Sequence, residues 1–151
     1  MSAAPRILIV TAPFYEDITT ELLAGVTTVF DAAGATYEII EVPGAFEIPG
    51  AILYAHSAGL AGTVEPYDGY AGLGCVIRGE TSHYDYICEE SIRGLMELTL
   101  NHGLAIVNGI LTVENQEQAM TRANRSDKNK GGDFGAGLLD TIALKIKFGL
   151  A

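Results

Sequence analysis

Basic residues are scarce in this sequence. The 151 residues include nine lysines and arginines but nineteen aspartates and glutamates, so the formal net charge is -10. A chain this acidic is repelled by nucleic acid and by anionic lipid. Long apolar runs are also missing, since ILIV in the first such segment is far shorter than the roughly 20 residues of a membrane helix. We therefore expect neither a nucleic-acid partner nor a membrane partner.

Cysteine and histidine are rarer still, with two and three copies. Cys75 and Cys88 form no CxxC motif and lie in apolar surroundings, which favours buried reduced thiols over a disulfide framework. His56, His83 and His102 are too scattered for zinc-ligand spacing, so we expect no metal. The stretch MSAAPRILIV contains neither a secretory h-region nor a cleavage site, which favours a cytoplasmic protein.

The composition is that of a protein with a substantial core. Hydrophobic residues make up 48% of the chain and charged residues 19%, which argues against disorder. A chain of this length fits one domain over residues 1–151, and no internal repeat or linker is visible.

Four apolar runs predict β-strands. They are RILIVT (6–11), TYEIIEV (36–42), YAGLGCVI (70–77) and LAIVNGIL (104–111). Their nearly continuous hydrophobicity is typical of parallel strands that are covered on both faces. Helical patterns lie between and after the strands. The predicted fold class is therefore α/β, a three-layer sandwich around a doubly wound, four-stranded parallel sheet.

The helical patterns are bounded by recognisable signals. Asp17 is a candidate N-cap for the first helix, and Asn115 with Gln118 resembles a capping box that starts a short helix. The predicted long helices cover 17–33, 47–60, 84–101 and about 134–148.

The helix predicted over 84–101 is apolar on more than one face. Ile92, Met96 and Leu100 fall outside the face that carries Tyr84, Ile87, Cys88, Ser91, Leu95 and Leu98. One explanation is a broad core stripe. The other is that the second face packs against a neighbouring subunit. We expect a homo-oligomer.

Residues able to bind a ligand come directly after every predicted strand. The segments are TAPFYED, PGAFEIPG, RGETSHYD and TVENQEQA. In open α/β sheets, ligands bind beyond the carboxyl ends of the strands. Taken alone, Phe14 and Phe46 fit core aromatics, and Pro43-Gly44 fits a simple turn. Together the segments place aromatics, a carboxylate, hydroxyls and a histidine at one edge, which predicts a binding site there.

The stretch Gly79 to His83 joins a strand to a helix. Backbone N–H groups in the first turn of a helix favour a bound anion. Thr81 also fits a simple N-cap, and His83 also fits a solvent-facing histidine. Beside a bound anion, His83 would instead be placed to accept a proton.

Four of the nine basic residues fall in RANRSDKNKGG: Arg122, Arg125, Lys128 and Lys130. This clustering favours an anion site, with a solvated turn as the alternative, and arginine matches phosphate oxygens well. The nucleotide motifs fail, because neither GxGxxG nor a P-loop is present at the required spacing. A small phosphorylated metabolite fits better than a nucleotide.

Three longer motifs occur in order: VPGAFEIP, GCVIRGETSHYDYI and GILTVENQEQAMTRA, and an NKG turn comes after them. In these segments the sequence resembles the lumazine synthase family, over nearly the whole chain. The resemblance implies a flavodoxin-like fold. It also implies a transferase of riboflavin biosynthesis that condenses 5-amino-6-ribitylamino-2,4-pyrimidinedione with 3,4-dihydroxy-2-butanone 4-phosphate, releasing phosphate and water, with neither metal nor redox cofactor.

The resemblance also implies roles for residues on the pyrimidine side of the site. Phe14 would stack on the pyrimidine ring. The ribityl chain would be held by Ala45, Phe46 and Glu47, together with backbone groups near Cys75, Val76 and Ile77.

On the phosphate side, the resemblance implies that Glu80 and Thr81 contact the phosphate end and that His83 moves protons. Arg122 would bind the phosphate, with Lys130 nearby. The segments around Asn108 and Arg122 would come from an adjacent subunit. The implied assembly is a pentamer, or a 60-subunit shell of pentamers.

The chain departs from the family pattern at Asn108, where many members carry an aromatic residue, and in the longer connection TVEPYDG (63–69). Asn108 would replace a stacking face by hydrogen bonding, which affects substrate affinity more than reaction class. It also motivates an alternative, a non-catalytic protein of the same fold that binds flavin or lumazine or forms a shell.

Overall fold

The computed structural model describes residues 3–150 and contains a four-stranded, all-parallel sheet. The strands are β1 (Arg6–Thr11), β2 (Thr36–Glu41), β3 (Gly69–Ile77) and β4 (Ile106–Val113), in the spatial order β2-β1-β3-β4. The α/β prediction and the flavodoxin-like order are confirmed.

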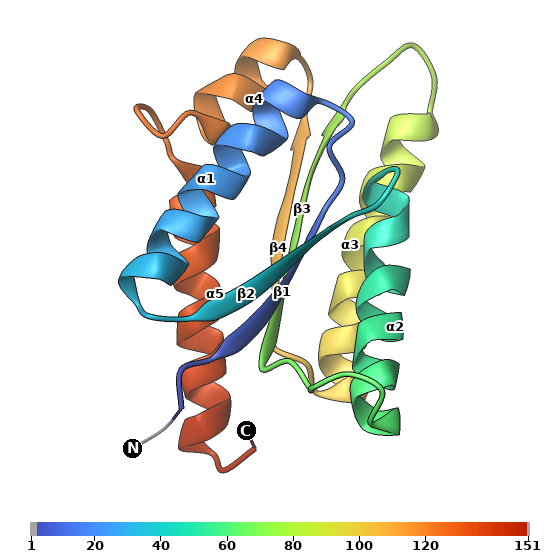
Figure 1. Cartoon of the computed structure of the whole chain (residues 1–151). Helices are drawn as coiled ribbons and strands as arrows, with labels where there is room; N and C mark the ends of the chain where they lie inside the picture. The colour runs from blue at the N-terminus through green and yellow to red at the C-terminus, as the bar shows by residue number, and fades with distance from the viewer. Residues whose placement is uncertain (1–2, 151) are drawn as a thin grey trace.

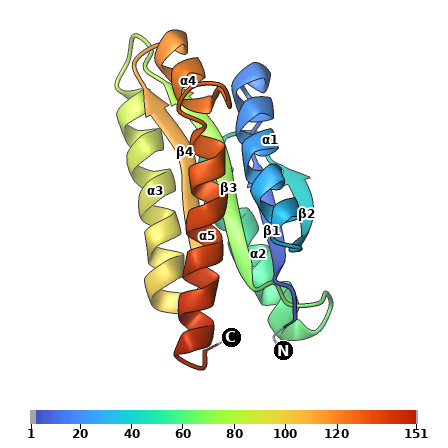
Figure 2. The same ribbon diagram turned by 90° about the vertical axis from the view of Figure 1, so that its left-hand side faces the viewer.

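Helices cover both faces of the sheet (Figures 1 and 2). One layer contains α2 (Ile48–Ala61) and α3 (His83–His102), and a short 3-10 helix, η1 (Ala45–Glu47), precedes α2. The other layer contains α1 (Glu16–Ala32), α4 (Gln116–Ala123) and α5 (Lys130–Lys147). Among the described residues, no helix is both long and apolar enough to cross a membrane.

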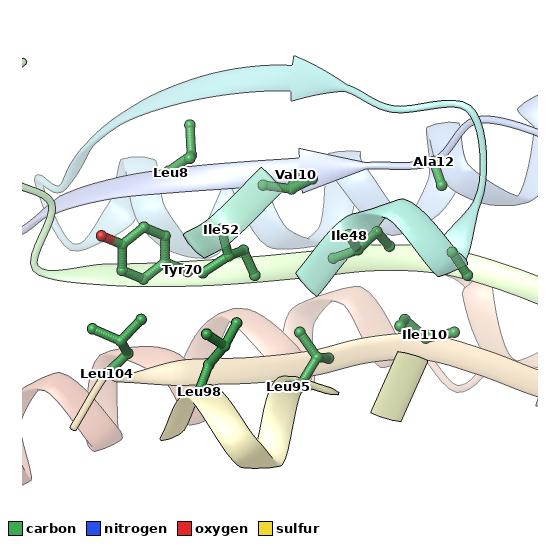
Figure 3. Packing of buried hydrophobic residues seen from close by; sticks show 11 residues of the cluster. Leu8, Val10, Ala12, Ile48, Ile52, Tyr70, Leu95, Leu98, Leu104 and Ile110 are labelled. Carbon is green, nitrogen blue, oxygen red and sulfur yellow. The ribbon is translucent and has the colours of Figure 1, made fainter. Parts of the chain in front are cut away.

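The two layers bury separate cores. On one face, Leu8, Val10 and Tyr70 of the sheet pack with residues of the two helices α2 and α3. Figure 3 shows these helix residues: Ile48, Ile52, Leu95 and Leu98. On the other face, Ile7, Ile9 and Leu73 pack with Val26, Phe30, Leu138 and Ile142. Each aliphatic side chain buried in this way contributes about 1.5–3 kcal/mol. These cores hold the sheet rigid beneath the loops at the ends of its strands.

One strand prediction was wrong in an important respect. β2 is not covered on both faces, because it lies at the edge of the sheet and most of its residues are exposed. Ile39 and Ile40 are 44% and 37% exposed. The other edge strand, β4, is buried at four of its eight residues, so the apolar composition of β2 predicts a strand but not how far it is covered.

The helix boundaries also differ from prediction, by one residue at each end of α2 and α3 and more informatively at α1 and α5. α1 begins one residue earlier, with Tyr15 at the N-cap position, so Asp17 lies in the first turn and is not the cap. α5 begins at Lys130, four residues before the predicted start, after Asn129 in the left-handed conformation. Gly131 therefore belongs to a helix, although the NKG sequence predicts a turn. A Cβ at Gly131 would collide with the carbonyl oxygen of Leu22 in α1, so this glycine allows two helix backbones to approach closely.

The α3 helix exposes two of the three residues of its second apolar face, while the third, Ile92, is half-buried. Leu95 and Leu98 are buried, whereas Met96 and Leu100 are 55% and 74% exposed. A broad core stripe is therefore wrong for Met96 and Leu100. The apolar residues that the sheet cannot cover remain available for a subunit contact.

Candidate functional site

The carboxyl ends of all four strands meet at one edge of the sheet, at the top of Figure 1. The segments that leave this edge lead into α1, η1, α3 and α4. Because the strands are parallel, the four polar segments at their carboxyl ends start side by side. The structure therefore brings together segments that are far apart in sequence.

A cavity of about 730 Å³ lies at this edge. That volume is within the range of small-molecule sites. Nine of the thirteen predicted site residues line it: Phe14, Ala45, Phe46, Glu47, Cys75, Val76, Ile77, Thr81 and His83.

Two aromatic rings at the cavity are unusually exposed. Phe14 is 74% and Phe46 59% exposed, so the interpretation of both as core residues is wrong. The Phe14 ring meets that of Tyr15 edge to face, with centroids 5.0 Å apart. Exposed ring faces in a cavity are suited to stacking against a planar ligand.

The end of β3 forms the inner part of the cavity lining. Cys75 is 6% exposed, and its burial raises the pKa of the thiol to about 12. The thiol is therefore protonated at neutral pH and is not a nucleophile. Cys88 is only half-buried, so just one of the two cysteines has the predicted burial.

The start of α3 supplies the polar lining. The N-cap position belongs to Ser82, one residue after the predicted cap, but the Thr81 hydroxyl accepts a hydrogen bond from the His83 N–H at 3.3 Å. His83 is exposed at the helix start and lines the cavity. Its imidazole can therefore reach a ligand without any rearrangement of the core.

Four predicted residues do not line the cavity within one chain. Glu80 is exposed beside it. Asn108 lies midway along β4, where its Oδ1 accepts from the Ile110 N–H at 3.0 Å. Arg122 donates to the Gln118 carbonyl of its own helix at 3.0 Å. Lys130 is the fourth predicted site residue that does not line the cavity.

The basic cluster is partly neutralised. Arg125 pairs with Glu21 at 3.2 Å, and Lys130 lies 3.7 Å from Asp133. Arg122 forms no ion pair with any residue that the structure describes. Of the two predicted phosphate-binding residues in this segment, Arg122 and Lys130, it is Arg122 that keeps its charge free for an anion.

Sequence reasoning assigned no site role to two further residues of the cavity lining, Tyr84 and Ile87. Tyr84 and Ile87 share the apolar stripe of α3, and this pattern predicts core residues. Burial raises the pKa of the Tyr84 hydroxyl, so this group stays neutral. Tyr84 and Ile87 lie in the first turns of a helix that starts at the carboxyl edge of the sheet, and this position could have assigned both residues to the site.

The fold and the cavity define an α/β protein of flavodoxin-like strand order with a small-molecule site at the carboxyl edge of its sheet. The family described as 6,7-dimethyl-8-ribityllumazine synthase matches residues 4–145, and the chain belongs to this family.

Relatives of this chain include several proteins with that name. One from Bartonella tribocorum is 51% identical, covering 99% of this chain and 95% of the relative. One from Agrobacterium fabrum is 52% identical, covering 96% of this chain and 97% of the relative. The 6,7-dimethyl-8-ribityllumazine synthase 1 of Rhizobium meliloti is 51% identical, with 95% and 94% covered.

Proposed function

We propose that this chain is a transferase that condenses 5-amino-6-ribitylamino-2,4-pyrimidinedione with 3,4-dihydroxy-2-butanone 4-phosphate. The product is 6,7-dimethyl-8-ribityllumazine, and phosphate and water are released. The observation that carries the proposal is the identity of about half of all residues with synthases over nearly the whole chain. The cavity, lined by the residues of the family motifs, supports it.

The pyrimidinedione fits the aromatic side of the cavity. Phe14 presents an exposed ring face for stacking on the heterocycle. The ribityl hydroxyls need hydrogen-bond partners, and Glu47 and residues 75–77 line the same cavity. Ala45 and Phe46 complete this side with apolar contacts.

The butanone phosphate fits the start of α3. The helix dipole and the N–H groups after Gly79 favour an anion there, with Glu80 and Thr81 at the same turn. His83 supplies an imidazole that takes up the proton lost when an amine condenses with a ketone. Arg122, with Lys130, adds positive charge to the phosphate position when a second subunit provides it.

We propose that the protein assembles as a pentamer, with closure into a 60-subunit shell as a larger form. Met96 and Leu100 are exposed on α3, and Asn108, Arg122 and Lys130 do not line the cavity of their own chain. Both observations agree with a site completed between subunits. Sedimentation of a species of about five or sixty times 16.0 kDa is expected, and a fully active monomer would contradict the assembly. One domain over residues 1–151 and a cytoplasmic location stay predictions.

The decisive experiment mixes purified protein with both substrates and monitors the absorbance and fluorescence of the lumazine. We expect formation well above the uncatalysed condensation; a rate equal to the uncatalysed one would contradict the proposal. Tight binding of lumazine without turnover would instead select the non-catalytic alternative, which no observation on the described residues favours.

A further inference from the structure

Arg78 comes directly after β3 and makes an unusual set of contacts just outside the cavity. Its Nε donates to Glu114 Oε2 at 2.6 Å, and its Nη1 donates to Asp85 Oδ1 at 3.2 Å. The guanidinium carbon also lies 4.2 Å from the centre of the Tyr84 ring. One side chain therefore engages two carboxylates and an aromatic face.

These contacts join the start of α3 to the ends of β3 and β4, which the backbone already pairs through the Arg78 N–H and the Val113 carbonyl at 3.0 Å. Asp85 and Tyr84 are in the first turn of α3, while Glu114 is in the connection between β4 and α4. Glu114 is itself fixed, because its N–H donates to Gln118 Oε1 at 2.8 Å, within α4. Arg78 thus connects the end of β3 to the starts of both α3 and α4.

The first turn of α3 is the part of this network that touches the cavity. Thr81, His83 and Tyr84 line it, whereas Arg78 does not. The charge of Arg78 is also already compensated by two carboxylates. Arg78 is therefore poorly suited to bind a phosphate directly, in contrast to Arg122.

We propose that Arg78 is a positioning residue that holds the first turn of α3, and with it Thr81 and His83, in register with the phosphate position. This inference rests on the proposed function. Arginine is required because its planar fork pairs with two carboxylates while its face stacks on the Tyr84 ring. A lysine at this position keeps the charge but loses the fork and the stacking.

The first test compares the steady-state constants of Arg78→Gln with those of the unaltered protein. A displaced helix start misaligns the phosphate end, so we expect kcat to fall about tenfold and KM for the butanone phosphate to rise about fivefold. KM for the pyrimidinedione should not change, because Phe14 and Phe46 are on other segments. Inorganic phosphate should inhibit about fivefold more weakly, for the same reason.

Arg6→Gln is the matched control. Arg6 also pairs with a carboxylate, Glu38, at 2.7 Å and lies 4.4 Å from the Tyr67 ring centre. It is at the opposite end of the sheet, so its loss removes the same kinds of contact without touching the cavity. We expect unchanged kinetic constants for this variant. Losses equal to those of Arg78→Gln would show a general stability effect and overturn the inference.

Further variants test the network itself. Asp85→Asn and Glu114→Gln should each reproduce part of the effect, and combining either with Arg78→Gln should add little. Arg78→Lys should retain less than half of the wild-type kcat. Wild-type kinetic constants in Arg78→Gln, or an equal rise of KM for both substrates, would overturn the positioning role. In either case the activity of the unaltered protein would still support the proposed function. An inactive unaltered protein would refute the proposed function itself.

Discussion

The two ends of the sheet carry the same interaction, an arginine that pairs with carboxylates and stacks on a tyrosine. At the amino end, Arg6 binds Glu38 and stacks on Tyr67, and Tyr67 donates to Glu38 at 3.0 Å. This cluster fastens the connection over 63–69 to the first two strands. At the carboxyl end, the corresponding cluster around Arg78 borders the large cavity.

The large cavity lies at the carboxyl end of the sheet, although both ends carry the same residue types. The reason is the kind of segment that adjoins the strands at each end. Segments at the amino end only return the chain to the sheet, so their polar clusters tie a loop down. Segments at the carboxyl end start helices, and helix starts provide free N–H groups and a favourable dipole. Similar ion-pair clusters therefore have different consequences when only one of them adjoins helix N-termini.

The largest effect is expected for Arg122→Ala at the carboxyl end. Loss of a charge-assisted phosphate contact costs about 2–3 kcal/mol. Initial rates should therefore show KM for the butanone phosphate raised by about thirtyfold or more. Arg125→Ala is the control, since Arg125 pairs with Glu21, and it should leave KM unchanged. Equal weakening of pyrimidinedione binding would contradict the assignment of Arg122.

A smaller effect is expected for His83→Ala, which removes the proton acceptor from the start of α3. Steady-state assays should give a kcat lower by about tenfold or more, with an unchanged melting temperature because His83 is exposed. His102→Ala is the control at the other end of the same helix, and should be fully active. Wild-type activity of His83→Ala from about pH 6 to 8 would remove His83 from the mechanism.

At the amino end of the sheet, a substitution should lower stability and leave activity unchanged. Arg6→Gln removes an ion pair and a stacking contact that lie far from the cavity, so calorimetry should show a melting temperature lower by about 2 °C with kcat intact. A loss of activity with an unchanged melting temperature would break the comparison between the two ends.

The smallest effect concerns pH. The hydrogen bond from Arg6, and to a lesser extent that from Tyr67, lowers the pKa of Glu38 below its usual value. A carboxyl with a lowered pKa stabilises the folded state above its unfolded pKa, and this contribution is lost as pH falls through the folded pKa. Melting curves from about pH 7 to 3 should therefore converge for the unaltered protein and Glu38→Gln at the acid end. A constant difference would contradict the ion pair.

Local patterning was sufficient to predict the four strands, the five helices and their alternation, because hydrophobic periodicity reflects burial along each element. It failed where burial depends on position in the assembled fold. β2 has the composition of a covered strand but lies at an edge, where most of its residues are exposed. Gly131 of the NKG sequence lies in α5 instead of a turn, in close contact with Leu22 of α1.

The candidate site divides in the same way. Residue types and motif order are enough to single out Phe14, Phe46 and His83, since an aromatic or a histidine after a strand has a recognisable chemistry. The inclusion of Tyr84 and Ile87 in the cavity and the pairing of Arg125 with Glu21 depended on distances between segments. Chain pattern specifies which elements form, but only packing places one element's side chains against another's.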